Sequence, residues 1–157
     1  MIYINQKEAE TTLIYTIMKS LPLVEATYLD SIFIISNLMK EGKVGSIIIM
    51  DQNNNPVGII TERDIVRRVI SEGKDPKTTK TTEIMSKPLI TVEKGTYLYD
   101  VAKKMVKNKI RRLPIVNDNK LVGIVTVTDI IKYFHEKNKD DNYLSKAMIR
   151  YGKYWEE

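Results

Sequence analysis

The sequence predicts an α/β fold of the α+β kind, built from two tandem repeats that each have the order β-α-β-β-α. Two observations carry this prediction. The chain matches itself at a spacing of 65 to 67 residues, with Pro22-Leu23-Val24 falling on Pro88-Leu89-Ile90. Within each half, the spacing of apolar residues also changes from strand-like to helical in the same order.

A second pair of motifs fixes the alignment of the two halves. Gly58-Ile-Ile-Thr61-Glu-Arg-Asp64 falls on Gly123-Ile-Val-Thr126-Val-Thr-Asp129 at a spacing of 65, and Ile17-Met18 falls on Ile84-Met85 at 67. The drift in spacing requires one extra residue in each of two loops, the turn before the proline and the Asn-rich turn at 52–56.

Each repeat opens with a short strand, expected near Leu23-Val24 and at Leu89–Val92. A helix is expected next, at Leu29–Lys40 and Tyr97–Asn108. In the second copy the apolar residues recur at helical spacing and predict one buried face: Leu98, Val101, Ala102 and Met105.

A hairpin and a second helix complete each repeat. The hairpin strands are continuous apolar runs around turns rich in asparagine, which predicts buried strands. They are expected at Ser46–Met50 with Val57–Ile60, and at Leu113–Val116 with Leu121–Val125. The second helices are expected at Glu62–Glu72 and Val127–Glu136.

The resulting organisation is an N-terminal extension at 1–15, a first repeat at 16–73, a linker at 74–82, a second repeat at 83–138 and a tail at 139–157. A three-stranded sheet of about 55 residues cannot bury both faces, so the two copies are expected to pack together. The extension is expected to form a short strand or helix, with Ile14 and Ile17 as apolar contacts.

Aromatic and apolar residues recur at helical spacing in the tail and predict an amphipathic helix. These residues are Tyr143, Leu144, Ala147, Met148, Tyr151, Tyr154 and Trp155. Packing on the chain's own repeats is slightly favoured, and the alternative is a dimer or partner contact.

Composition excludes several classes of site and limits the functions to be expected. The 157 residues carry a net charge of +5 and no cysteine, which excludes disulfides, thiolate metal sites and a thiol nucleophile. No apolar run approaches the ~18 residues of a membrane span, and no targeting segment is evident, so a cytoplasmic protein is expected. The positive charge, spread over many lysines, favours anionic ligands in a general way.

Catalytic machinery is not evident in the sequence. Neither a Walker-type loop nor a GxGxxG motif follows a predicted strand, and no nucleophile can be paired with a base. His135 is the single histidine and is expected to lie on the surface near a helix end, and no metal cluster is expected. The sequence therefore predicts a protein that is not an enzyme.

The paired Thr-x-x-Asp motifs suit nucleotide binding. Each places a hydroxyl and a carboxylate at the first turn of a helix, where free amides can meet a phosphate and the carboxylate can accept both hydroxyls of a ribose. Gly58 and Gly123 would permit close backbone approach. The alternative is a helix capping box, favoured about two to one on the local pattern alone.

The element order, the paired Gly-x-x-Thr-x-x-Asp motifs, the opening Ile-Met-x(2–3)-Pro and the Arg111–Asn117 segment resemble CBS repeats, named for cystathionine β-synthase, over residues 16–136. The resemblance implies a Bateman module with pseudo-twofold symmetry, two clefts between the repeats and assembly as a homodimer. It also implies AMP, ADP, ATP or S-adenosylmethionine as the ligand.

Site residues follow from the resemblance. Asp64 and Asp129 would bind the ribose diol, and Thr61 and Thr126 the ribose or phosphate. The base would be held by Leu23, Val24, Gly45 and Ser46 in one repeat and by Leu89, Ile90, Thr91, Ile110, Arg111 and Pro114 in the other. Phosphate contacts are expected from Arg63, Arg111 or Arg112, each of which can equally be a solvated surface residue. Lys19 and Lys87 are weaker candidates, and the surface interpretation is favoured for both.

The predicted function is a regulatory module that requires no cofactor, senses an adenine nucleotide in one or both clefts and signals to a separate protein. The second-repeat site is favoured because Arg-Arg-Leu-Pro is closest to the family pattern. The alternatives are an S-adenosylmethionine sensor, or a scaffold that binds nucleic acid or protein with its clefts empty.

Overall fold

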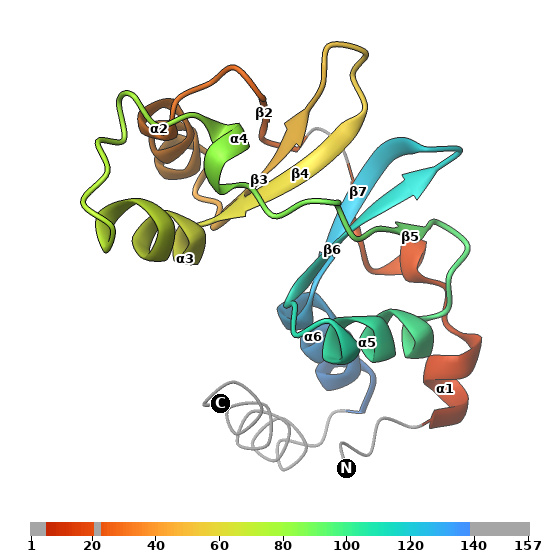
Figure 1. Cartoon of the computed structure of the whole chain (residues 1–157). Coiled ribbons are helices and arrows are strands. Elements are labelled where there is room, and N and C mark those ends of the chain that lie inside the picture. The colour runs from red at the N-terminus through yellow and green to blue at the C-terminus, as the bar shows by residue number, and fades with distance from the viewer. Residues whose placement is uncertain (1–5, 21–22, 139–157) are drawn as a thin grey trace. The chain divides into compact units, whose positions relative to one another are not determined.

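The chain forms two compact units in the computed structural model, which describes residues 6–20 and 23–138 (Figure 1). The first-repeat unit comprises Leu21–Thr91 with Asp118–Leu121, and the second-repeat unit comprises Met1–Ser20, Val92–Asn117 and Val122–Glu157. Each has its own sheet and helices, which confirms the predicted duplicated α/β fold. That the two copies pack sheet against sheet stays a prediction.

The first-repeat unit contains a three-stranded sheet in the order β2-β3-β4, with β2 parallel to β3 and β3 antiparallel to β4. Its strands are β2 (Glu25–Thr27), β3 (Ser46–Met50) and β4 (Pro56–Thr61). Its helices are α2 (Ile32–Gly42), α3 (Glu62–Ile65), the π-helical turn η2 (Val66–Ile70) and α4 (Thr81–Ile84). The core is mostly isoleucine: Ile32, Ile35, Ile47, Ile49, Ile60 and Ile84, with Ala26, Met39 and Val69.

The second-repeat unit contains a four-stranded sheet in the order β1-β7-β6-β5. Its strands are β1 (Lys19–Ser20), β5 (Val92–Glu93), β6 (Arg112–Asn117) and β7 (Lys120–Thr126). Its helices are α1 (Gln6–Thr11), the short 3-10 helix η1 (Ile14–Thr16), α5 (Leu98–Lys107) and α6 (Val127–Asn138).

The N-terminal extension packs on the second-repeat unit. Helix α1 lies against α5, the Leu98 amide donates to the Thr12 carbonyl at 2.8 Å, and Ile14 is fully buried. The Tyr133 hydroxyl of α6 lies 3.1 Å from the Thr12 hydroxyl and 3.2 Å from a Glu8 carboxylate oxygen. The expectation of a short packed element in this region is confirmed.

Several predicted boundaries are wrong by two to four residues. The opening strands lie later than expected, at Glu25–Thr27 and Val92–Glu93. Helix α2 begins at Ile32 rather than Leu29, because Asp30 closes a turn onto Thr27 and the Ser31 hydroxyl caps the helix. The second helix of the first repeat ends at Ile70, in a π-helical turn that the predicted α-periodicity did not include.

The segments that precede the two prolines cross to the hairpin of the other repeat. We call residues 17–20 and 84–87 the leader segments. Lys19 and Ser20, which form β1, pair antiparallel with β7 of the second repeat. Ser86 exchanges two backbone hydrogen bonds with Ile59 on β4 of the first repeat, at 2.9 and 3.2 Å. Each unit therefore contains one repeat's hairpin and the other repeat's leader segment.

This exchange explains Gly58 and Gly123. A Cβ at Gly58 would lie 2.6 Å from the Met85 sulfur, and a Cβ at Gly123 would lie 2.6 Å from the Lys19 carbonyl oxygen and 2.9 Å from the Met18 sulfur. The sequence interpretation assigned this close approach to a ligand. In the structure, the leader segment makes the approach.

Gly123→Ala is expected to lower the free energy of unfolding by about 1–2 kcal/mol, because the new methyl group meets backbone that cannot rotate away. Gly58→Ala is the matched control and should cost less, since the Met85 side chain can move aside. Urea unfolding midpoints of the two variants measure the difference. A larger loss for Gly58→Ala would contradict the idea that the Lys19 backbone of β1 leaves no room for a methyl group at Gly123.

The predicted turns of both hairpins are confirmed and use left-handed residues, Asn54 in the first and Asp118 with Asn119 in the second. Asp51 organises the first turn. Hydrogen bonds from the Asn55 amide, the Asn55 side chain and the Asn53 amide lower the pKa of Asp51 below its ordinary value of 3.8.

An NMR titration of the Asp51 carboxyl should therefore give a pKa below 3.8. Because the Asp51 pKa is lower in the folded than in the unfolded protein, the carboxylate stabilises the hairpin at a pH above the pKa of the unfolded protein. This contribution is lost as the pH falls through the pKa of the folded protein. In Asn55→Ala, which removes the side-chain donor and keeps both backbone amides, the Asp51 pKa should rise. An unchanged pKa would show that this side-chain bond does not hold the carboxylate.

Candidate functional site

Each repeat has a corner where the second hairpin strand turns into a helix, and we call these the motif corners. In the first, the Asp64 amide donates to the Thr61 hydroxyl at 3.2 Å. Asp64 Oδ2 in turn accepts from the Thr61 amide at 2.9 Å and from the Thr61 hydroxyl at 2.6 Å. These bonds form a capping box at the start of α3.

The second motif corner repeats this arrangement at the start of α6. Asp129 Oδ2 accepts from the Thr126 amide at 2.8 Å and from the Thr126 hydroxyl at 2.6 Å, and the Asp129 amide donates to that hydroxyl at 3.3 Å. The capping alternative is therefore confirmed for both motifs. Since each Oδ2 already accepts two hydrogen bonds, Oδ1 is the oxygen open to other partners.

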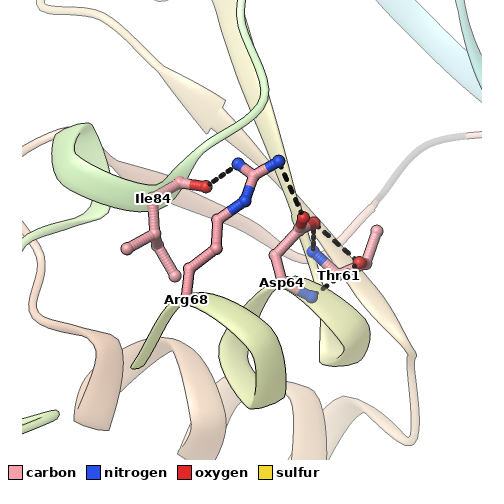
Figure 2. A network of polar contacts seen from close by, with 4 residues as sticks. All are labelled: Thr61, Asp64, Arg68 and Ile84. Atoms are coloured by element: carbon pink, nitrogen blue, oxygen red, sulfur yellow. Dashed lines mark hydrogen bonds and ion pairs between the residues drawn. The ribbon is translucent and has the colours of Figure 1, made fainter. Parts of the chain in front are cut away.

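A cation faces Oδ1 in each motif corner, and the two cations come from different elements. Arg68 of η2 lies 3.4 Å from Asp64 Oδ1 and also donates to the Ile84 carbonyl of the leader segment (Figure 2). Lys19 of β1 lies 3.5 Å from Asp129 Oδ1. The Asp64 and Asp129 side chains are only 14% and 11% exposed, so both ion pairs lie at the edge of the protein interior.

The sequence analysis missed Arg68, although its position four residues after Asp64 on a helix is a spacing that favours an ion pair. It included Lys19 as a weak phosphate contact, and the structure instead pairs Lys19 with Asp129. This pairing depends on the exchanged leader segment, which no local pattern indicates.

The loop before the first hairpin strand also reaches each motif corner. The Glu62 amide donates to the Gly45 carbonyl at 3.3 Å, and the Val127 amide donates to the Arg111 carbonyl at 3.0 Å. Each loop contains a left-handed lysine just after the preceding helix, Lys43 directly after α2 and Lys109 two residues after α5. Gly45 and Arg111 therefore lie beside the motif corners, and their contact with a base stays a prediction.

The other predicted residues are distributed over both units. Ser46 pairs with Thr61 across β3 and β4, Val24 packs against the first-repeat core, and Arg63 is exposed in the first turn of α3. Leu23, Lys87, Leu89, Ile90 and Thr91 also belong to the first-repeat unit, whereas Ile110, Arg112 and Pro114 belong to the second. Their contact with a ligand stays a prediction.

Other classes of site find little support in the part of the chain that the structure describes. Among residues 6–20 and 23–138, no group of three His, Asp or Glu side chains is placed to hold a metal ion. Within the same ranges, no helix has the length and apolar character needed to cross a membrane. The His135 side chain and the predicted tail helix lie outside the described residues.

A duplicated α/β unit with a capped Thr/Asp corner in each copy defines a protein with two tandem domains of one family. The family model for the CBS domain matches residues 14–71 and 82–136. The chain belongs to the CBS domain family, as a pair of CBS repeats, and such pairs are commonly ligand-binding regulatory modules.

Relatives and solved structures agree with this assignment. An uncharacterized protein of Methanopyrus kandleri is 50% identical over 95 residues, which cover 60% of this chain and 48% of that protein, so the chain spans about half of that relative. The CBS domain-containing protein YhcV of Bacillus subtilis is 35% identical, covering 79% of this chain and 81% of YhcV. The CBS domain pair of protein MJ0100, solved with 5′-methylthioadenosine and S-adenosyl-L-methionine, is 32% identical with a TM-score of 0.72, covering 81% of this chain and 98% of that one.

Proposed function

We propose that this CBS pair is a regulatory module that binds an adenine nucleotide (AMP, ADP or ATP) at one or both of its motif corners and signals to a separate protein, without catalysing a reaction. The observation that carries the proposal is the arrangement at Asp129. A carboxylate oxygen that its own cap leaves open lies beside a lysine ammonium, at the start of a 12-residue helix.

This arrangement suits a phosphorylated nucleoside. Asp129 Oδ1 can accept a ribose hydroxyl while Oδ2 keeps the cap, so one oxygen serves the ligand where the sequence interpretation expected the whole carboxylate to take both hydroxyls. The Val127 and Asp129 amides are already bonded, so a phosphate near the start of α6 would be met mainly by the Lys19 ammonium.

The ligands named for the MJ0100 domain pair support the same chemistry, because both carry an adenosine moiety. S-Adenosylmethionine is therefore the alternative ligand for this chain. The cations at both motif corners and the net charge of +5 favour a ligand that bears phosphate over a cationic sulfonium.

Calorimetric titration with AMP, ADP, ATP and S-adenosylmethionine tests the proposal. At least one adenine nucleotide should bind, and Asp129→Asn, which keeps the shape of the side chain, should weaken that binding at least tenfold. Asp100→Asn is the matched control, because Asp100 is an exposed acid in the first turn of α5 in the same unit. Binding of none of the four ligands, or equal affinity of both variants, would refute the proposal.

Assembly as a homodimer belongs to the same proposal. Large apolar side chains are exposed on the helices of the first-repeat unit and in the loop before α2, and they need a cover that a second copy can supply. They are Leu29, Phe33, Ile34, Val66 and Ile70. Light scattering measures the molecular mass of the wild type and of the double variant Val66→Lys, Ile70→Lys. A monomeric wild type would exclude a homodimer that covers these side chains.

A nucleic-acid-binding or protein-binding scaffold is the second candidate, favoured by the net charge of +5 and the pI of about 9.2. RNA binding that falls steeply with salt and survives Asp64→Ala with Asp129→Ala would support the scaffold. Loss of nucleotide binding in the same double variant would support the sensor.

A further inference from the structure

The two motif corners carry the same cap but hold their cations differently. Arg68 comes from the helix that follows its own corner, and its guanidinium has two partners, Asp64 and the Ile84 carbonyl (Figure 2). The position equivalent to Arg68 in the second repeat is Tyr133, which is uncharged and hydrogen-bonds toward Thr12 and Glu8. The cation at Asp129 comes instead from the leader segment.

The Lys19 ion pair is suited to exchange. Its nitrogen lies 3.5 Å from the carboxylate oxygen, and the Arg68 pair is almost as long at 3.4 Å, so the two corners differ in exposure and in the second anchor of the arginine, the Ile84 carbonyl. The lysine side chain is 65% exposed, so water already competes for the ammonium. An ammonium on a flexible stem can turn to a new anion without moving the backbone, whereas a guanidinium held at two points cannot.

We propose that Lys19 is an exchangeable counter-ion that makes the second motif corner selective for phosphorylated adenine ligands. In the free protein the ammonium neutralises Asp129. When a ribose hydroxyl occupies Asp129 Oδ1, the ammonium transfers to the ligand's phosphate, and the Asp129 carboxylate keeps hydrogen bonds from Thr126 and from the ribose in place of the ion pair. The Asp64 corner keeps its doubly held arginine and serves as a structural cap.

The exchange also links the ligand to the N-terminal extension. Lys19 lies on β1, whose hold on β7 is only two residues long. The same segment continues back through η1, where the Ile14 amide donates to the Thr96 carbonyl at 2.9 Å. A ligand that removes the Lys19 tether from Asp129 therefore alters the attachment of β1, and by linkage any partner that holds β1 in place alters the affinity for the ligand.

The test compares AMP with adenosine, which lacks the phosphate, in calorimetric titrations of the full chain. This inference rests on the proposed function, and the ratio of the two affinities isolates it. Lys19→Met, which keeps the apolar stem, should lower the affinity for AMP about tenfold, equivalent to ~1.4 kcal/mol, and leave that for adenosine unchanged or tighter. Lys19→Arg should restore the preference for AMP.

Lys103→Met is the matched control, since Lys103 is an exposed lysine on α5 of the same unit and belongs to neither motif corner. It should keep the wild-type ratio of affinities. An unchanged ratio in Lys19→Met, or an equal change in Lys103→Met, overturns the role of Lys19 without affecting the proposal that the protein binds a nucleotide. Failure of the wild type to bind AMP or adenosine refutes the proposed function and this inference together.

Discussion

Phe134→Ala should lower the free energy of unfolding by about 3–5 kcal/mol, because it opens the largest cavity that a single truncation can make among the fully buried side chains described. Phe134 is 2% exposed on the inner face of α6. Its ring meets that of Tyr133 edge to face, with centroids 5.3 Å apart, so the loss includes a specific aromatic contact as well as buried area.

The duplication supplies a matched control. The position equivalent to Phe134 is Val69, which is also fully buried, and Val69→Ala should cost about 2 kcal/mol because far fewer buried carbon atoms are removed than with the phenyl ring. Urea unfolding measures both losses. If Phe134→Ala lowered the free energy of unfolding less than Val69→Ala does, α6 and the N-terminal extension would have to shift and fill the cavity left by the ring.

Hydrogen exchange provides a second measurement on Phe134→Ala. Tyr133 contacts both Phe134 and the N-terminal extension, through Thr12 and Glu8. Amides in α1 and η1 should therefore exchange faster in the variant than amides in α2, which belongs to the other unit. Uniform acceleration over both units would instead indicate global destabilisation.

The elements that the sequence predicts well are those determined by local pattern. The strands β3, β4, β6 and β7 are continuous apolar runs joined by Asn-rich turns, so their positions are correct to within one residue. Helix ends were less accurate because they depend on single caps such as Ser31. The sequence could not predict the pairing of the leader segments with the other repeat's hairpin, since a two-residue strand has no periodicity and its partner lies far along the chain.

The candidate site likewise combines features determined by local sequence with features that depend on the fold. The Thr/Asp pairs were recognisable, and both interpretations of them, cap and ligand contact, follow from the same local geometry. In the structure, the capping box uses Oδ2 of each aspartate, and Oδ1 faces another partner. The partner of that second oxygen is local in the case of Arg68 but distant in the case of Lys19, which only the fold brings to Asp129.

Asp64→Ala is expected to destabilise the protein by about 2–3 kcal/mol, the second-largest loss among these variants. The substitution removes the Asp64 half of the capping box, while the Thr61 hydroxyl still accepts from the amide of residue 64. It also withdraws the anion from Arg68, whose guanidinium then holds the Ile84 carbonyl without its counter-ion (Figure 2). Because Ile84 is buried in the first-repeat core, the loss should spread from the cap into packing.

Asp129→Ala tests this reasoning at the equivalent position. It removes the same half of the capping box, but the Lys19 ammonium is 65% exposed and is resolvated at little cost, so about 1 kcal/mol should be lost. Arg68→Met alone should cost less than Asp64→Ala, and the double variant should fall short of the sum because the two residues share one network. Equal losses for Asp64→Ala and Asp129→Ala in urea unfolding would mean that the arginine adds nothing beyond the cap.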